Sequence, residues 1–411
     1  MSGEETNVAP QDQVTPTVGG FDGVVVLGAG YAGLTLALEI DRLSCHRIPV
    51  TVIDRHPIHV LRTKLFEVDR INGTGNADER WALPLSKVLT HSRVGFRQGT
   101  VQEIDLGHQT VYLDTGEISY RSLVIAVGNT DRYYGVPGAQ ELTESVYHLS
   151  RAQRLAQRLQ AIAMESGKLP GERRARIVVV GGGITGTELA GEIATTDWSV
   201  VVRAPVKPFD VVLVTGSFPF LSGLRKPVIR HAETLLTKAG VSIIRGTSVA
   251  RVEPSKVFLE DGTVLAADAV VWCAGLAPPD FVARLSSRHG GGGRIAVQET
   301  LEVPGCPGVF AIGDAAEYKD PITDVVVPAT AQAAVAEAKI AATNIVRSYE
   351  GKGLLPFHYR ERGVLVSVGR RKGVGRIGPI TIWGGMAHLL KNAVDKTYSS
   401  AVSKGEEAPI L

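Results

Sequence analysis

The 411-residue sequence has few cysteines, almost no net charge and no long hydrophobic run. Three cysteines, Cys45, Cys273 and Cys306, are too few and too widely spaced for a disulfide framework or a zinc site. The 44 Lys and Arg residues balance 42 Asp and Glu, so charge gives no reason to expect a nucleic-acid partner. The longest uncharged stretches, 23–38 and 377–390, are too short to span a membrane. Residues 1–20 lack the apolar core of a secretory signal, so we expect a disordered N-terminus and a cytoplasmic protein.

Glycine, in contrast, is abundant and occurs twice in the same arrangement. Residues 24–33 read VVVLGAGYAG, and residues 177–186 read IVVVGGGITG. Each G-x-G-x-x-G follows a strand-like run and precedes a helical pattern, as in a dinucleotide-binding turn. The first glycine permits the sharp bend, the second lets the backbone approach a pyrophosphate, and the third allows tight helix packing. Two such turns predict two dinucleotide sites, and electrons can pass from one cofactor to the other.

Acidic residues follow two other predicted strands. The strand at 50–53 ends in Asp54, 26 residues after the first glycine, where an acid would hold the ribose hydroxyls. The strand at 308–312 is followed by Gly313 and Asp314. Here the aspartate either faces a cofactor's ribityl hydroxyls or caps a helix, and the sequence leaves both open.

The second unit departs from this pattern at its ribose position. Its strand at 210–214 ends at Thr215, where a protein that binds NADH would carry an acid. Loss of the acid removes repulsion of a 2′-phosphate, and Arg225 or Lys226 can help to hold one. Both NADH and NADPH are therefore candidate donors.

Strand-like and helical runs alternate through most of the chain, which predicts an α/β fold with parallel sheets. We expect two Rossmann-like dinucleotide-binding domains and a smaller C-terminal region. The first domain would comprise residues 21–145 and 277–350, the second residues 146–276, and the C-terminal region residues 351–411.

The order of these motifs resembles the two-dinucleotide flavoprotein reductases, a superfamily that includes the pyridine nucleotide-disulfide oxidoreductases. Within it, residues 181–192 and 328–334 are most similar to type II NADH dehydrogenases, which are non-pumping quinone reductases. The resemblance covers about residues 22–370 and implies FAD on the first unit and NADH or NADPH on the second. The implied FAD residues are Gly28, Gly30, Tyr31, Ala32, Gly33, Asp54, Arg55, Arg62, Val101, Ala126, Gly128, Gly313, Asp314 and Ala331. The implied nicotinamide residues are Gly181, Gly183, Ile184, Thr185, Gly186, Glu188, Thr215 and Gly275.

The resemblance also implies two catalytic residues. Glu188, expected to open the helix after the second turn, would deliver or relay a proton to the reduced acceptor. The alternative is a structural glutamate that the dipole of the helix's first turn favours. Gln332 matches the family's acceptor-side glutamine, whereas Ala336 replaces a second glutamine, which leaves the acceptor open.

Disulfide reductases of this superfamily use a cysteine pair, and no cysteine lies between Cys45 and Cys273. We therefore expect electrons to pass from the flavin directly to a quinone-type acceptor. One alternative is reduction of a soluble metabolite or an electron-carrier protein, and another is a redox-sensing flavoprotein.

The C-terminal region carries an apolar stripe beside basic residues. The stripe comprises Met386, Leu389, Leu390, Ala393 and Val394, and a cluster that includes Arg370 and Arg371 precedes it. Such a helix can attach peripherally to the inner face of an anionic cell membrane. The alternative is a helix that caps a domain or forms a homodimer contact.

Overall fold

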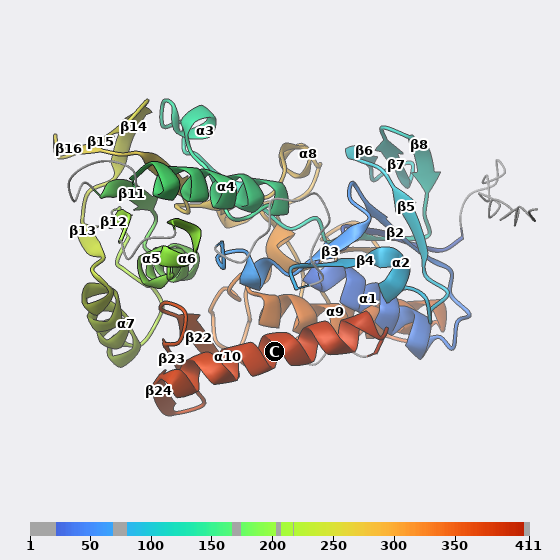
Figure 1. The fold of residues 1–411 in the computed structure, drawn as a ribbon. Helices are drawn as coiled ribbons and strands as arrows, with labels where there is room; N and C mark the ends of the chain where they lie inside the picture. The colour runs from blue at the N-terminus through green and yellow to red at the C-terminus, as the bar shows by residue number, and fades with distance from the viewer. Residues whose placement is uncertain (1–21, 69–79, 167–173, 203–206, 217, 407–411) are drawn as a thin grey trace, which may run out of the picture.

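The protein is described by a computed structural model that covers residues 22–68, 80–166, 174–202, 207–216 and 218–406 (Figure 1). The N-terminus expected to be disordered, residues 1–20, lies outside these ranges.

A five-stranded parallel sheet forms the core of the first unit. Its strands run in the order β20 (Val309–Ala311), β9 (Ser122–Ile125), β1 (Val24–Leu27), β2 (Val50–Asp54) and β5 (Gly95–Gln98). Helices α1 (Tyr31–Leu43) and α9 (Ala331–Tyr349) share an apolar cluster with this sheet. The other face packs against the antiparallel strands β6 (Val101–Asp105), β7 (Thr110–Leu113) and β8 (Gly116–Ser119). Because all five core strands are parallel, their carboxyl ends meet at one edge.

The second unit repeats this design around a four-stranded parallel sheet. Its order is β13 (Ser242–Arg245), β12 (Phe209–Thr215), β11 (Ala175–Val180) and β17 (Ala269–Trp272). Helices α4 (Leu149–Ser166), α5 (Ile184–Thr195) and α7 (Lys226–Ala239) pack on one face. The antiparallel strands β14 (Val249–Glu253), β15 (Lys256–Leu259) and β16 (Val264–Ala266) cover the other face. The predicted α/β fold with two dinucleotide-binding units is thus confirmed.

Shorter elements complete these units. They are β3 (Ile58–Val60), η1 (Arg62–Lys64), β4 (Ala82–Pro84), α2 (Leu85–Val88), α3 (Ala139–Leu142), α6 (Ser199–Val202), α8 (Asp280–Ala283), η2 (Gly291–Gly293), β19 (Ile295–Ala296), η3 (Gly313–Ala315) and β21 (Ala316–Glu317).

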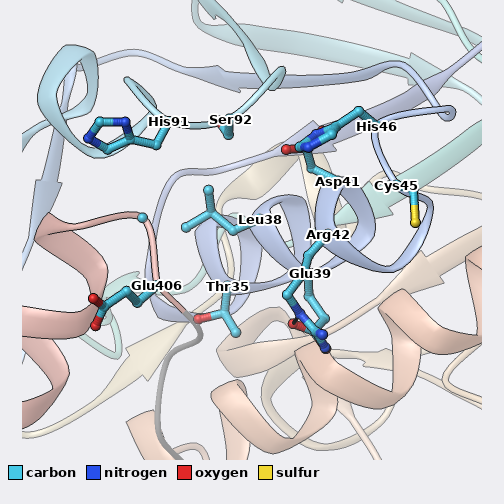
Figure 2. Close-up of a pocket in the computed structure, with 11 residues that line it drawn as sticks. Thr35, Leu38, Glu39, Asp41, Arg42, Cys45, His46, His91, Ser92 and Glu406 are labelled. Atoms are coloured by element: carbon cyan, nitrogen blue, oxygen red, sulfur yellow. Dashed lines mark hydrogen bonds and ion pairs between the residues drawn. The ribbon is translucent and has the colours of Figure 1, made fainter.

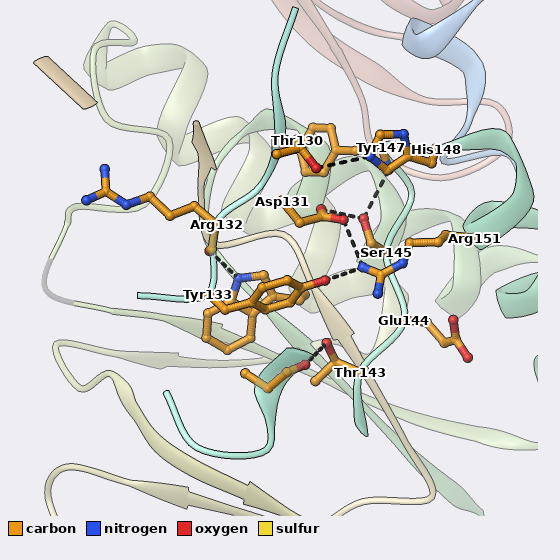
Figure 3. A network of polar contacts seen from close by, with 12 residues as sticks. Thr130, Asp131, Arg132, Tyr133, Thr143, Glu144, Ser145, Tyr147, His148 and Arg151 are labelled. Carbon is orange, nitrogen blue, oxygen red and sulfur yellow. Dashed lines mark hydrogen bonds and ion pairs between the residues drawn. The ribbon is translucent and has the colours of Figure 1, made fainter. Parts of the chain in front are cut away.

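A polar network fixes the crossing between the two units (Figure 3). Here β10 (Thr130–Asp131) pairs antiparallel with β18 (Leu276–Ala277). The Asp131 carboxylate accepts hydrogen bonds from Ser145 Oγ at 2.6 Å and from Arg151 Nη1 at 2.9 Å. The Arg151 guanidinium also donates to the Tyr133 hydroxyl. The strands that connect the units are therefore held by a partly buried ion pair.

The C-terminal region forms a small antiparallel sheet and one long helix. The sheet contains β22 (Gly363–Ser367), β23 (Gly373–Ile377) and β24 (Ile380–Gly384), and α10 (Gly385–Ser403) follows it. In Figure 1, α10 runs along the lower side of the molecule, from β24 beneath the second unit toward α1 and α9. Its buried residues are Ala387, Asp395, Tyr398 and Val402. The helix therefore caps the core with a face other than the predicted apolar stripe, of which Met386 and Leu389 are 64% and 69% exposed.

Candidate functional site

The first glycine turn joins β1 to α1 with the geometry expected of a phosphate loop. Gly28 has a φ of +102°, and a Cβ there would overlap the carbonyl oxygen of Ala126. A Cβ at Gly33 would overlap the carbonyl oxygen of Gly28. A Cβ at Gly30, in contrast, would meet no atom within 4 Å, and no side chain caps the helix that begins there. The turn thus leaves open space beside uncapped backbone N–H groups, which suits an anionic pyrophosphate.

The structure brings the other implied FAD residues to the same sheet edge. Asp54 ends β2, and its Oδ2 accepts a hydrogen bond of 2.8 Å from the backbone N–H of Ala29. This bond fixes the carboxylate against the glycine turn and leaves lone pairs for ribose hydroxyls. Val101 begins β6, three residues after Gln98, which pairs with Asp54. The remaining members are Tyr31, Ala32, Arg55, Arg62, Ala126, Gly128, Gly313, Asp314 and Ala331, which lie at the strand ends or in the segments that follow them.

Asp314 lies in η3 at the end of β20 and does not cap a helix. The cap position of this short turn is Ile312, so the alternative of an N-cap aspartate is wrong. Burial raises the pKa of the Asp314 carboxyl, although the nearby Arg62 and Arg294 lower it in part. The carboxyl accepts no hydrogen bond from the residues that the structure describes, whereas the preceding Gly313 N–H donates to Glu337 Oε2 at 2.6 Å. A half-buried carboxyl without a protein donor fits the ribityl hydroxyls of a flavin.

The second glycine turn has the same construction. Gly181 has a φ of +119°, and a Cβ there would overlap the backbone of Cys273. A Cβ at Gly186 would overlap the Gly181 carbonyl oxygen, whereas one at Gly183 would meet nothing within 4 Å. Ile184 and Thr185 begin α5 directly after the turn, Thr215 ends the neighbouring β12, and Gly275 follows β17. The implied nicotinamide residues other than Glu188 therefore lie at the edge of the second sheet.

Glu188 lies between the second unit and the C-terminal region. It is the fifth residue of α5, so the expectation that it opens the helix, and the alternative of a first-turn glutamate, are both wrong. Its Oε1 accepts a hydrogen bond of 2.9 Å from the Ser367 N–H and forms an ion pair with Lys391. Burial raises the pKa of the Glu188 carboxyl, and this effect outweighs the opposite effect of Lys391. A buried carboxyl with a raised pKa keeps its proton to a higher pH than an exposed one, so Glu188 is a candidate proton donor.

The polar contacts continue from Lys391 along α10 into the first unit. One turn further, Asp395 Oδ1 accepts a hydrogen bond of 3.0 Å from Thr63 Oγ1, which also lies 3.0 Å from the Tyr31 hydroxyl. A further turn on, the Tyr398 hydroxyl lies 3.3 Å from His59 Nε2. The sequence interpretation missed this set, although the spacing 391, 395, 398 places its members on one helix face. Lys391, which pairs with Glu188, thus lies on the same helix as Asp395 and Tyr398, which contact residues of the first unit.

Gln332 is the second residue of α9. Its Oε1 accepts hydrogen bonds of 3.0 Å from the Tyr359 hydroxyl and from the Arg362 N–H. Both implied catalytic side chains therefore contact the C-terminal region, but they do so from different helices and through different partners.

The three cysteines form no disulfide, and one hollow lies away from the two sheet edges. All three cysteines are free. Cys45 is exposed, Cys306 is half-buried, and Cys273 directly follows β17, where burial raises the pKa of its thiol. A hollow of about 290 Å³ lies along α1, where Gly405 and Glu406 pass (Figure 2). One polar pair that lines it, His46 Nδ1 and Asp41 Oδ1 at 2.8 Å, lies at the end of α1 opposite to the glycine turn.

Two parallel sheets, each with a glycine turn at its carboxyl edge, define a two-dinucleotide-binding fold. The sequence matches the pyridine nucleotide-disulphide oxidoreductases over residues 22–338. The protein belongs to that family, which confirms the predicted superfamily.

Curated relatives agree with this assignment, and solved structures agree with the fold. The chain is 26% identical over 382 residues to the NADH dehydrogenase-like protein YutJ of Bacillus subtilis, covering 90% of this chain and 97% of that protein. It is 28% identical over 409 residues to the type II NADH:quinone oxidoreductase Ndh of Mycobacterium tuberculosis, covering 93% and 85%. Its fold is similar to that of NDH2 from Plasmodium falciparum, solved with NADH, with a TM-score of 0.80 and 14% identity over 95% and 100% of the chains. The sulfide:quinone oxidoreductase of Aquifex aeolicus has a TM-score of 0.76 and 22% identity over 94% and 93%.

Proposed function

We propose that the protein is an FAD-dependent NAD(P)H:quinone oxidoreductase that works without a redox disulfide. The observation that carries this proposal is the buried Glu188–Lys391 pair. Glu188 follows the second glycine turn, and Lys391 belongs to α10, which also contacts the first unit through Asp395. The similarity to curated type II NADH:quinone oxidoreductases supports a quinone as the acceptor. The three free cysteines support direct transfer to that acceptor.

The residues at the first sheet edge would hold FAD. The Gly28–Gly33 turn would bind its pyrophosphate, Asp54 its ribose and Asp314 its ribityl chain. When bound, FAD supplies the two-electron chemistry that links a nicotinamide to a quinone. The Gly181–Gly186 turn would hold the nicotinamide nucleotide on the second sheet.

Glu188 and Lys391 would handle the proton that quinone reduction consumes. Conversion of NAD(P)H and a quinone into NAD(P)⁺ and a quinol takes up one proton from the medium. Burial keeps the Glu188 proton available by raising its pKa, and the Ser367 N–H orients the carboxyl. Lys391, which also lies 4.5 Å over the Phe66 ring, would balance the carboxylate after the proton has left.

Anaerobic titration of the purified protein tests this proposal. We expect a yellow protein whose flavin absorbance is bleached by NADH or NADPH and restored by stoichiometric menadione or a short-chain ubiquinone. A preparation that takes up no FAD would contradict the proposal. Restoration by soluble electron carriers alone, with no response to any quinone, would contradict the choice of acceptor.

We also propose that the protein attaches peripherally to an anionic membrane through the start of α10. Within the described ranges, the structure contains no helix with the length and apolar character needed to cross a bilayer. Met386 and Leu389 are exposed on α10, which directly follows β24 with its exposed Ile380 and Trp383. Arg371 is exposed in the turn between β22 and β23. An exposed apolar patch next to cations suits the surface of an anionic bilayer.

Co-sedimentation with vesicles that contain phosphatidylglycerol tests the membrane proposal. We expect Met386→Ser/Leu389→Ser to abolish most of the binding, because each residue contributes apolar area to the bilayer. The control Val200→Ser/Val264→Ser removes two exposed apolar residues of the second unit and should bind like the wild type. Equal binding by all three proteins would contradict the proposal. A patch that instead joins two copies would appear as a dimer that the first variant dissociates.

A further inference from the structure

We propose that the nicotinamide site accepts a 2′-phosphorylated dinucleotide, NADPH, and that Arg245 is the residue that recognises its 2′-phosphate. This inference rests on the proposed function, because it concerns the donor that the same second unit binds.

The end of β12 carries no negative charge where the ribose would lie. Thr215 ends this strand and is 1% exposed. A Cβ at Gly182 would lie 2.6 Å from Thr215 Cγ2, so the Thr215 methyl group packs beneath the phosphate loop. An acid at this strand end would bind the 2′-hydroxyl and repel a phosphate, and Thr215 does neither.

A cation occupies the matching position on the next strand. Arg245 ends β13, and the parallel register pairs it directly with Thr215 at the carboxyl edge of the sheet. Its side chain is 51% exposed, and Nη2 donates to Glu233 Oε1 of α7 at 3.0 Å. A guanidinium has five N–H donors in a planar fork, so this single bond holds the group in place and leaves donors for phosphate oxygens.

Further groups near the carboxyl ends of β12 and β13 suit a phosphate. Gly216, which follows Thr215, places no side chain between the strand end and Ser248, whose Oγ would lie 3.1 Å from a Cβ at Gly216. Across the part of the chain that the structure describes, the Ser248 hydroxyl makes no hydrogen bond, so it can donate one to a ligand. Arg225 and Lys226 are exposed at the start of α7, and Figure 1 shows α7 beside β13. Arg245, Arg225 and Lys226 thus supply three cations on β13 and at the start of α7, and Glu233 offsets one of them.

Binding of nucleotide fragments tests the inference independently of electron transfer. We expect adenosine 2′,5′-bisphosphate to bind the purified protein about tenfold or more tightly than AMP, the effect of one charge-assisted hydrogen bond. Isothermal calorimetry measures both values. In Arg245→Ala this preference should vanish, and kcat/KM should fall about tenfold for NADPH while it stays within about twofold for NADH.

Arg251→Ala provides a matched control. Arg251 is 48% exposed and pairs with Glu253 at 2.9 Å, but it lies in β14 and away from the strand end. This variant should keep the bisphosphate preference of the wild type. Equal binding of AMP and the bisphosphate by the wild type, or an unchanged preference in Arg245→Ala, would overturn the inference. Fragment binding that persists in a protein without quinone reductase activity would contradict the proposed function alone.

Discussion

Replacement of Gly183 by alanine is expected to weaken binding of the nicotinamide nucleotide by about 100-fold, or about 2.7 kcal/mol. The Gly183 backbone has a φ of −76° and a ψ of −176°, which any residue adopts, and a Cβ there meets no protein atom within 4 Å. The substitution therefore leaves the protein's own packing unchanged. Only a pyrophosphate bound in the turn would collide with the new methyl group. Fluorescence titration with NADH and NADPH measures the effect, and Tm and FAD content should match those of the wild type.

The first glycine turn offers a matched control for this prediction. Gly30 has an equally ordinary backbone and equally open surroundings, so Gly30→Ala should reduce retention of FAD and leave nucleotide-fragment binding intact. Gly186→Ala should instead destabilise the protein and lower Tm, because the new Cβ would overlap the Gly181 carbonyl oxygen. Unchanged nucleotide affinity in a folded Gly183→Ala protein would contradict a phosphate-binding role for this turn.

Glu188→Gln is expected to lower kcat for quinone reduction by about 100-fold, at the lower end of what a general acid contributes. The amide keeps an oxygen for the Ser367 N–H but carries no transferable proton. Because the protonated carboxyl is the active form, the wild-type kcat should fall as pH rises through the raised pKa of Glu188. The variant should lose this limb of the profile. Steady-state assays at saturating quinone across pH 5 to about 9 show both effects.

A second buried glutamate on the same helix controls for burial alone. Glu192 lies one turn after Glu188 in α5 and is 2% exposed, so Glu192→Gln should retain the kcat and pH profile of the wild type. Lys391→Met removes the partner of Glu188 and should lower Tm and raise the pKa of the Glu188 carboxyl further, because burial then acts without the opposing cation. A wild-type pH profile in Glu188→Gln would show that this carboxyl does not supply the proton.

The sequence predicted those parts of the site that depend on neighbouring residues. A glycine turn is defined within ten residues, and a parallel sheet necessarily brings the residues after each strand to one edge. The implied FAD residues therefore lie together although Gly28 and Asp314 are far apart in the chain. The same rule placed Thr215 beside the second turn.

The partners of Glu188 could not be derived in this way. Lys391 is 203 residues away, and a lysine and an aspartate on a helix normally indicate a solvent-facing side. Here the polar residues face inward because Glu188 and Thr63 compensate them, while apolar Met386 and Leu389 face outward. Hydrophobic periodicity predicts that the apolar face of a helix is buried. This prediction is wrong for a helix such as α10, whose buried polar residues are paired.

The position of α10 also determines when the site becomes complete during synthesis. Both glycine turns and Glu188 leave the ribosome long before Lys391, and domains generally begin to fold in that order. Until the last helix docks, the Glu188 carboxyl has neither its cation nor, before residue 367, its backbone donor. A nascent or truncated chain that ends before α10 would thus carry both nucleotide turns without a finished proton site.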